Sequence, residues 1–249
     1  MKIYSPDALK GKNILVTGAS TGIGKAIAIL LAECSASVVL ASRNEERLRE
    51  VCELLPGVGH SYCPVDMRNA ESMAVLVDTL PKLDGIVYNA GVLQWATCRS
   101  VSTELIQTTM ETNFQGVVEM QSMIMHRKKI NKGASLVFMS SEAACRQSVG
   151  QCIYSASKAA LLAYSKTLAL ELASKKIRVN SVLPAMVNTS IIDNGMVDAE
   201  QISRIVENYP LRRIGEPEDV AQLVAYLLSD ASSWMTGSSL VIDGGASLM

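Results

Sequence analysis

The sequence has few of the residues that mark metal sites and no charge imbalance. It contains two histidines, and its six cysteines form no C-x-x-C pair, which argues against structural zinc and favours free thiols. Cys145 and Cys152 lie close to Tyr154 in sequence, where burial as small hydrophobes is favoured over a reactive thiol. With 23 Lys and Arg against 24 Asp and Glu, the chain offers no basic field for nucleic acid or anionic lipid.

Long hydrophobic runs are also missing. The most apolar region, residues 26–41, is interrupted by Glu33, Cys34 and Ser35, so it is too short to span a bilayer. The first residues lack the apolar core of a signal peptide. We therefore expect a cytoplasmic protein, and the length of 249 residues suits a single α/β domain over residues 1–249.

Tyr154 and Lys158 begin an apolar, alanine-rich run that is predicted to be helical. Their i, i+4 spacing places both side chains on one face of a helix, roughly 6 Å apart along its axis. A neighbouring ammonium favours the phenolate, so we expect Lys158 to lower the pKa of Tyr154. Taken alone, the spacing more often reflects a packed ring and a solvated ammonium.

A glycine-rich turn follows the first predicted strand, residues 13–17. Gly18, Gly22 and Gly24 lead from this strand into an amphipathic segment at residues 25–33. Strand, glycines and helix stand in the order of a phosphate-binding unit, in which backbone N–H groups at the helix N-terminus bind a pyrophosphate. A plain turn would also use glycine, but the flanking strand and helix favour binding.

The end of the second predicted strand, residues 37–42, indicates which dinucleotide fits. A carboxylate at this position would bind the ribose of NAD, whereas a basic residue accepts the 2′-phosphate of NADP. The sequence places Ser42, Arg43 and Asn44 there. Arg43 therefore favours NADP, with an ordinary surface charge as the alternative.

Strands and helices are predicted to alternate along the rest of the chain. Strands are expected at 60–64, 84–89, 134–140, 177–183 and 239–242, with helices at 45–55, 69–80, 102–129 and 217–229. This order predicts a doubly wound α/β fold with a parallel sheet, whose ligands collect at the carboxyl ends of the strands. The segment at about residues 189–210 is expected to form a substrate loop.

Four features of these elements each allow two interpretations. Asp66 either accepts a hydrogen bond from adenine or caps the helix at 69–80. Asn113 either marks a bend in the helix or has a function of its own. Ser141 either caps the next segment or donates to a substrate oxygen. The cations at residues 127–129 are expected to complement their helix C-terminus, with an acidic partner as the alternative.

Taken together, these motifs resemble the short-chain dehydrogenase/reductase family from about Leu9 onward. The motifs that carry the resemblance are Thr17-Gly18-x-x-x-Gly22-Ile23-Gly24, Asn89-Ala90-Gly91, Asn113, Ser141, Tyr154-x-x-x-Lys158, Arg178-Val179-Asn180 with Pro184, Thr236-Gly237 and Asp243-Gly244-Gly245.

The resemblance implies a Rossmann-type sheet of seven parallel strands and hydride transfer between NADP(H) and a carbonyl or alcohol. It implies Tyr154 as general acid, Ser141 as the donor that polarises the substrate oxygen, Lys158 as tuner of Tyr154 and ribose ligand, and Asn113 in the proton relay. The cofactor residues implied are Gly18, Ser20, Thr21, Gly22, Ile23, Gly24, Ser42, Arg43, Asn44, Asp66, Met67, Asn89, Ala90, Gly91, Tyr154, Lys158, Pro184, Val187 and Thr189.

Three positions depart from the family pattern. Ala185 and Ala144 replace common glycines and are expected to add methyl groups near the nicotinamide or substrate, while Tyr88 stands where asparagine is frequent. A 3-oxoacyl-thioester reductase is the first expectation, with a sugar, polyol or hydroxysteroid dehydrogenase as the alternative. A non-catalytic NADP-sensing protein is a second alternative. Family members usually form dimers or tetramers, and the apolar faces at 161–163 and 223–225 are compatible with such contacts.

Overall fold

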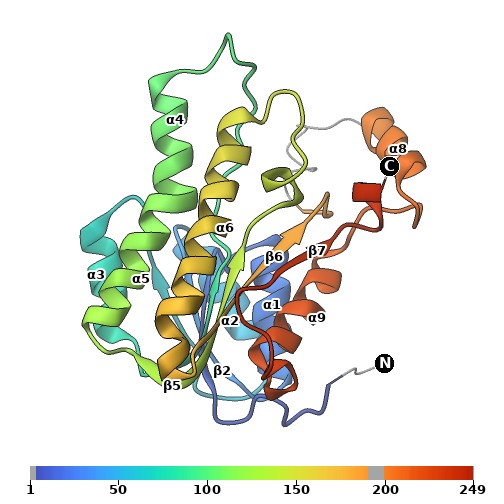
Figure 1. Ribbon diagram of the computed structural model, residues 1–249. Coiled ribbons are helices and arrows are strands. Elements are labelled where there is room, and N and C mark those ends of the chain that lie inside the picture. The colour runs from blue at the N-terminus through green and yellow to red at the C-terminus, as the bar shows by residue number, and fades with distance from the viewer. Residues whose placement is uncertain (1–3, 190–198, 249) are drawn as a thin grey trace.

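The fold is built on one sheet of seven parallel strands, in the order β3-β2-β1-β4-β5-β6-β7 (Figure 1). This computed structural model describes residues 4–189 and 199–248. The strands are β1 (Asn13–Thr17), β2 (Ser37–Ser42), β3 (Ser61–Pro64), β4 (Leu83–Tyr88), β5 (Ile130–Met139), β6 (Arg178–Pro184) and β7 (Ser239–Ile242). The expected seven-stranded parallel sheet is confirmed, although β5 begins four residues earlier than the predicted start at residue 134.

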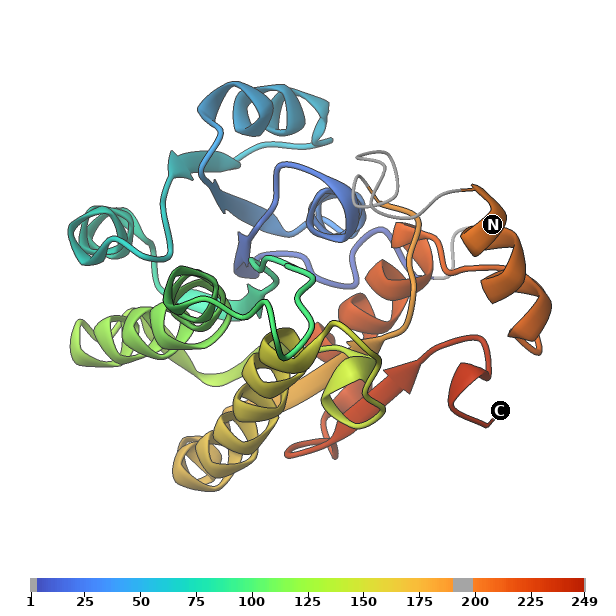
Figure 2. The same ribbon diagram turned by 90° about the horizontal axis from the view of Figure 1, so that it is seen from above.

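Helices cover both faces of the sheet (Figure 2). They are α1 (Gly22–Glu33), α2 (Glu45–Leu54), α3 (Ala70–Thr79), α4 (Thr103–Met110), α5 (Gly116–His126), α6 (Cys152–Leu172), α8 (Ala199–Asn208) and α9 (Pro217–Leu228). Because β1, β4 and β5 lie in the interior of a sheet covered on both sides, their side chains are buried on both faces, which explains why these strands are apolar runs without alternation.

Two hydrophobic clusters hold the layers together. On one face of the sheet, a cluster contains Ile27 of α1, Val224 of α9 and Val16 of β1. On the other face, a second cluster contains Met73 of α3, Leu161 of α6 and strand side chains that point to that face. Leu161, Leu162, Val224 and Ala225 are all buried within this chain. Leu161, Val224 and Ala225 belong to the two clusters and pack on the sheet, while the expected dimer or tetramer stays a prediction.

Polar side chains fix the starts of three helices. Asn44 accepts a hydrogen bond from the backbone N–H of Arg47, Asn69 accepts one from Ser72 and Ser102 accepts one from Leu105. Each of these bonds satisfies an N–H that has no partner within its helix. The cap of α3 is therefore Asn69, and the expectation that Asp66 caps it is wrong.

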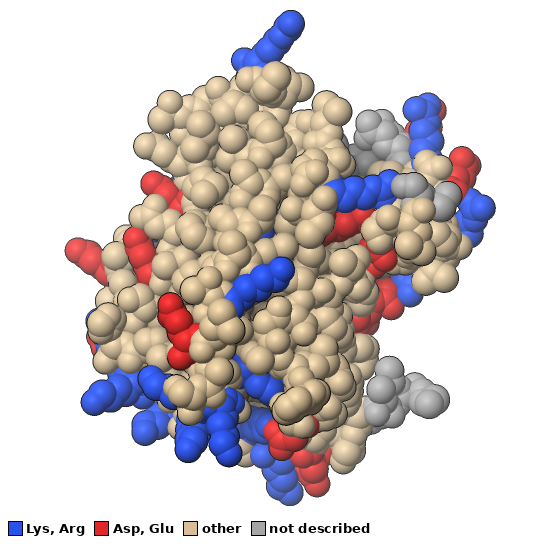
Figure 3. Space-filling model, in the orientation of Figure 1, with Lys and Arg blue, Asp and Glu red and all other residues tan. Residues whose placement is uncertain are grey.

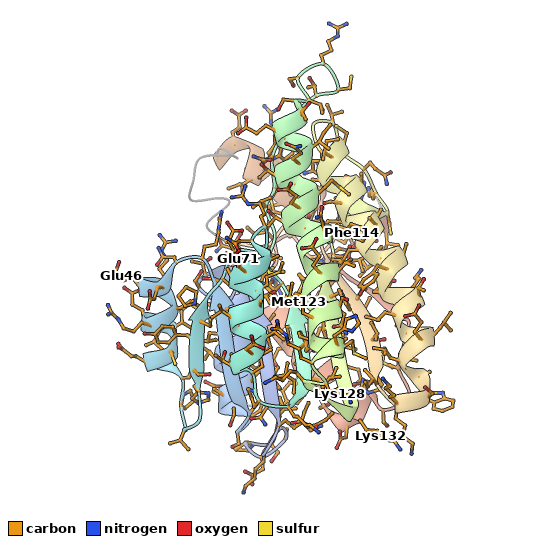
Figure 4. All side chains as sticks on the ribbon, turned by 90° about the vertical axis from the view of Figure 1, so that its left-hand side faces the viewer. Glu46, Glu71, Phe114, Met123, Lys128 and Lys132 are labelled. Atoms are coloured by element: carbon orange, nitrogen blue, oxygen red, sulfur yellow. The ribbon has the colours of Figure 1, made fainter. Side chains whose placement is uncertain are left out.

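The long helix expected at 102–129 is interrupted where asparagine and glycine occur. Residues 111–115 form a π-helical turn between α4 and α5, and the two helices follow one another as a single column (Figure 4). Gly116 follows this turn and lies against the loop after β3: a methyl group on Gly116 would come within 1.9 Å of the Met67 carbonyl oxygen. The absence of a side chain here lets the helix approach the sheet.

Basic side chains gather at the lower end of the molecule, where α5 ends (Figure 3). Lys128 and Lys132 lie in this region (Figure 4). Arg127 donates to the Ala74 carbonyl oxygen at 2.7 Å, and Lys129 donates to the Asp78 and Leu80 carbonyls at 2.9 and 2.7 Å. Arg127 and Lys129 therefore bind carbonyl oxygens of the neighbouring helix α3 and its C-terminal end, while they also stand at the end of their own helix, as expected.

None of the six cysteines forms a disulfide within the described part of the chain, but two are placed differently from the prediction. Cys145 and Cys152 are exposed, so their expected burial is wrong. Cys145 follows the short turn after β5, and Cys152 is the first residue of α6. Among the described residues, no helix combines the length and hydropathy needed to cross a membrane.

The close approach of Gly116 to Met67 can be tested by one methyl group. Gly116 has helical backbone angles, so alanine should stabilise the helix by about 1 kcal/mol if there were space. Because its methyl group would meet a carbonyl oxygen, we expect Gly116→Ala to lower the free energy of unfolding by about 2 kcal/mol. Urea denaturation measures this change. Gly215→Ala, whose methyl group would lie 3.4 Å from the nearest heavy atom, a Val187 methyl carbon, is the control and should not destabilise. An equally stable Gly116→Ala would contradict the account.

Candidate active site

A cavity of about 1190 Å³ lies at the carboxyl ends of the strands, around the point where β1 separates β2 from β4. The strand order reverses here, and ligands of open parallel sheets bind at such points. Most residues expected to bind the cofactor line this cavity, together with Ser141: Gly18, Ser20, Thr21, Gly22, Ile23, Ser42, Arg43, Asn44, Asp66, Met67, Asn89, Ala90, Gly91, Tyr154, Lys158, Pro184, Val187 and Thr189. Gly24 and Asn113 are not among the lining residues.

Gly24 serves the packing of the glycine loop. A methyl group on Gly24 would come within 2.1 Å of the Gly18 carbonyl oxygen. The Asn89 side-chain amide donates to this same oxygen at 3.2 Å. The Thr17 hydroxyl accepts hydrogen bonds from the backbone N–H groups of Asn89 and Ala90, at 3.0 and 3.1 Å. These bonds fix the ends of β1 and β4 together, so the loop is held close against the sheet.

The N-terminus of α1 fits a phosphate group. Thr21 precedes this helix, but its side chain makes no capping hydrogen bond, unlike the asparagines and serine that begin α2, α3 and α4. The first N–H groups of α1 are therefore left without a side-chain acceptor at a turn that lines the cavity. An anionic pyrophosphate would accept these hydrogen bonds and interact favourably with the helix dipole.

The cavity is lined by charges of both signs where β2 and β3 end. Burial raises the pKa of the Asp66 carboxyl, but hydrogen bonds from Arg68 and the charges of Arg68 and Arg43 outweigh it and lower the pKa overall. The Asp66 carboxylate accepts from the Arg68 backbone N–H at 2.9 Å. Asp66 is thus held as an anion that lines the cavity, in a place where it could accept a hydrogen bond from an adenine amino group.

The residues at the end of β2 and just after it have different roles. Asn44 is engaged as the cap of α2, whereas the Ser42 hydroxyl is buried and makes no hydrogen bond to the described part of the chain. Arg43 and Arg47 both line the cavity, and Arg47 was not predicted from the sequence. Its i, i+4 relation to Arg43 at the start of a helix is the signal that could have indicated it. A buried unpaired hydroxyl beside two guanidinium groups fits a polar, anionic ligand group.

Tyr154, Ser141 and Lys158 meet at the other end of the cavity. Tyr154 and Lys158 lie in the first turns of α6, and the Lys158 Nζ atom is 5.8 Å from the centroid of the Tyr154 ring. The Ser141 hydroxyl accepts from the Ala143 backbone N–H at 3.2 Å and also hydrogen bonds with Tyr154. Ser141 therefore caps the segment that follows it, while its role as donor to a substrate oxygen stays a prediction.

The ammonium group of Lys158 is buried. Its Nζ atom donates to the Met139 carbonyl oxygen at 2.8 Å, and the Ser140 hydroxyl donates to the Lys158 carbonyl oxygen at 3.0 Å. A methyl group on Gly91 would come within 3.2 Å of this Nζ atom, so a larger residue there would make the contact tight. Burial lowers the pKa of Lys158 to about 8, because a charged amine is poorly solvated there.

The pKa of Tyr154 is raised, against the expectation from its spacing to Lys158. Burial of the phenol is the larger effect and raises the pKa, while the hydrogen bond with Ser141 lowers it by less. The spacing of two residues indicates proximity but cannot show how far both are removed from water. In the protein alone, Tyr154 is therefore a protonated phenol at neutral pH.

Asn113 supports this site from behind the cavity wall. It lies in the π-helical turn and is fully buried. Its side-chain oxygen accepts from the Val92 backbone N–H at 2.7 Å, and its amide donates to the Val92 carbonyl at 2.9 Å and to Ser157 at 3.1 Å. The same oxygen would lie within 3.2 Å of a methyl group on Gly91. The helix interruption thus presents Asn113 to the loop that borders Lys158.

Comparison with known proteins agrees with this arrangement. A family model described as Enoyl-(Acyl carrier protein) reductase matches residues 18–247. Human Dehydrogenase/reductase SDR family member 4 is 37% identical, over 96% of this chain and 88% of its own. The 3-oxoacyl-acyl-carrier-protein reductase of Chlamydia pneumoniae is 36% identical, over 95% and 97%. A short-chain type dehydrogenase/reductase structure from Mycobacterium ulcerans superposes with a TM-score of 0.89 at 31% identity, over 97% and 91%.

The chain belongs to the short-chain dehydrogenase/reductase family. Two of its departures from the pattern of this family have a structural explanation. Tyr88 is fully buried, donates to Gln121 at 2.6 Å and stacks on Phe138 with ring centroids 4.8 Å apart. Ala185 lines the cavity, as expected, whereas Ala144 is not among the lining residues.

Several polar residues that line the cavity of this dehydrogenase/reductase were not predicted from the sequence. Beyond Ser141 and Tyr154, these are Glu142, Arg146 and Gln151, which lie in the segment between β5 and α6. Trp95 and Ala246 also line the cavity. Of the expected substrate loop, residues 190–198 lie outside the described residues, while Ile205 and Tyr209 reach the cavity.

The burial of Lys158 makes the stability of the protein depend on pH. Since its pKa is about 8 in the folded state and near 10.5 when unfolded, the unfolded state binds more protons between these values, and stability rises with pH there. From pH 7 to pH 10, we expect the unfolding free energy of the wild type to increase by roughly 2 to 3 kcal/mol relative to Lys158→Met. Urea denaturation at several pH values measures this difference, and parallel curves for the two proteins would contradict it.

Proposed function

We propose that the chain is an NADPH-dependent carbonyl reductase in which Tyr154 is the general acid. The observation that carries this proposal is the buried Tyr154 phenol, which hydrogen bonds with Ser141 and lies beside the Lys158 ammonium at the end of a nucleotide-sized cavity. The bound dinucleotide would supply the hydride. Ser141 and Tyr154 would donate hydrogen bonds to the substrate oxygen, where negative charge develops as the carbonyl is reduced.

The protonation state of Tyr154 suits the role of general acid. A general acid must carry its proton before reaction, and the raised pKa keeps Tyr154 protonated at neutral pH. As the substrate oxygen becomes an alkoxide, the phenol transfers its proton to that oxygen. The Lys158 ammonium then stabilises the phenolate, and Asn113 holds the loop that borders this lysine. Lys158 would also bind the ribose hydroxyls of the dinucleotide.

Charge near the end of β2 supports NADPH as the dinucleotide. Arg43 and Arg47 line the cavity there, and no carboxylate occupies residues 42–44. A guanidinium binds a phosphate through charge-assisted, bidentate hydrogen bonds. The 2′-phosphate would thus account for the two arginines, and the buried Ser42 hydroxyl offers a further donor.

Two substrate classes follow from the relatives, and a specific observation favours the second. Relatives from Chlamydia pneumoniae and Thermotoga maritima are named 3-oxoacyl-acyl-carrier-protein reductases, which supports a 3-oxoacyl thioester as substrate. Others are named D-erythrulose reductase in Gallus gallus and L-xylulose reductase in Caenorhabditis elegans. The substrate end of this cavity carries Glu142, Arg146 and Gln151, and these polar groups suit a hydroxylated ketone better than an acyl chain.

Replacing the phenol tests the enzymatic role. We expect Tyr154→Phe to reduce kcat with NADPH and a ketone by about 100-fold or more, because the general acid is lost. NADPH binding, followed by its fluorescence, should change little. Tyr164→Phe, on the same helix but packed against Phe114, is the matched control and should keep its turnover. A Tyr154→Phe enzyme that is as active as wild type would overturn the assignment, and a wild type that binds NADPH without any turnover would indicate a sensor.

Reversing one charge tests the choice of dinucleotide. We expect Arg43→Asp to lower the ratio of kcat/KM for NADPH over NADH by about 100-fold, because the new carboxylate repels the 2′-phosphate and accepts from the ribose hydroxyls. Steady-state kinetics with both dinucleotides measure this ratio. Arg49→Asp, an exposed residue of α2 that does not line the cavity, should leave the ratio unchanged. The same ratio in Arg43→Asp and wild type would contradict an NADP site.

A further inference from the structure

Glu142 holds a buried acceptor that the proposed chemistry does not use. It directly follows Ser141, lines the cavity and has a side chain that is only 15% exposed. Its Oε1 atom is inaccessible to solvent and lies 3.5 Å from Arg146 Nη1, which is long for a charge-assisted hydrogen bond. A buried carboxylate oxygen with one long contact can accept a further hydrogen bond, so its presence beside the reacting centre points to a ligand that supplies a donor.

Arg146 accompanies this carboxylate one helical turn later. The Arg146 Nη1 atom lies 3.5 Å from Glu142 Oε1, which is close enough for an ion pair. Arg146 also donates to the carbonyl oxygen of Ala246, so the C-terminal segment fixes the guanidinium at the cavity wall. The pair thus presents both an acceptor and a set of donors, and its two charges balance each other.

The other titratable groups around the pair do not disturb this balance. Tyr209 faces the cavity and its hydroxyl accepts from the Met186 backbone N–H at 3.3 Å. Asp243 is engaged by the backbone N–H groups of Gly245 and Ser247, at 2.9 and 2.8 Å. Burial and the charge of Asp243 raise the pKa of Glu142, while Arg146 lowers it. The pair therefore gives the substrate end little net charge.

We propose that Glu142 and Arg146 form a subsite for the hydroxyl groups of a polyhydroxylated ketone. This inference rests on the proposed function and names the substrate class of the same site. A hydroxyl group can donate to the Glu142 carboxylate and accept from the Arg146 guanidinium at once. Gln151 at the same end of the cavity offers a further donor and acceptor. The subsite thus matches several hydroxyl groups on one short carbon chain.

Other substrate classes leave the pair unsatisfied. The apolar chain of an acyl thioester would cover Glu142 Oε1 without donating to it, which costs roughly 1 to 3 kcal/mol for a buried polar group. A cationic amine would gain little, because Arg146 already balances the charge of Glu142. An anion would likewise gain little, because its attraction to Arg146 is offset by its repulsion from Glu142. Neutral hydroxyl groups are the ligand that the pair selects.

Matched substrates and matched variants test this subsite. The rates of NADPH oxidation with L-erythrulose and with 2-butanone give a ratio of kcat/KM values that reports recognition of the hydroxyl groups. We expect Glu142→Leu, which removes the acceptor at similar volume, to lower this ratio about 10- to 100-fold. Glu142→Gln keeps an acceptor oxygen and should lower the ratio less. Glu53→Leu, an exposed substitution on α2, is the control and should not change it.

Binding of a polyol provides a readout that does not depend on turnover. Xylitol, added to the complex with NADPH, should change the cofactor fluorescence in wild type and bind at least 10-fold more weakly to Glu142→Leu. NADPH binding by each variant checks that it is folded. An unchanged substrate ratio, or a wild type that prefers 2-butanone, would overturn the subsite while leaving the reductase intact. A wild type that reduces no ketone with NADPH would instead overturn the proposed function.

Discussion

The buried ammonium of Lys158 is the constraint on which the rest of the site depends. A cation taken out of water needs a fixed acceptor, and the Met139 carbonyl oxygen at the end of β5 supplies it. Its neighbours are arranged around this placement: Gly91 carries no side chain that would block it, and the interrupted helix presents Asn113 to the same loop. Tyr154, one turn earlier on α6, is thereby held over the ammonium.

The two ends of the cavity offer different kinds of groups to a ligand. The end that fits the dinucleotide relies on backbone groups and loop closure, with an uncapped helix at α1 and a glycine loop fixed by Thr17 and Asn89. The substrate end relies on side chains from loops, among which Glu142 and Arg146 form a charged pair. Since the first end follows from the strand order and the second from loop sequences, one fold can keep its cofactor while its substrate changes.

The sequence predicted the elements with regular spacing and missed the effects of burial. The parallel sheet and the pair Tyr154 and Lys158 follow from apolar runs and an i, i+4 relation, which local patterns reveal. The raised pKa of Tyr154 could not be predicted, because it depends on how much chain covers the phenol. Glu142 was missed for the same reason: on a short turn, a glutamate is normally exposed, whereas here its side chain is largely buried beside Arg146.

The central claim is that Tyr154 is a buried phenol that stays protonated until charge develops beside it. The most direct test is the ultraviolet absorbance titration of the wild type, from which the titration of Tyr154→Phe is subtracted. The account predicts a single tyrosine with a pKa above 10 in the free protein, and a lower pKa when NADP⁺ is present, because the oxidised ring is positively charged. A pKa at or below 10 in the free protein, or one that NADP⁺ leaves unchanged, would contradict it.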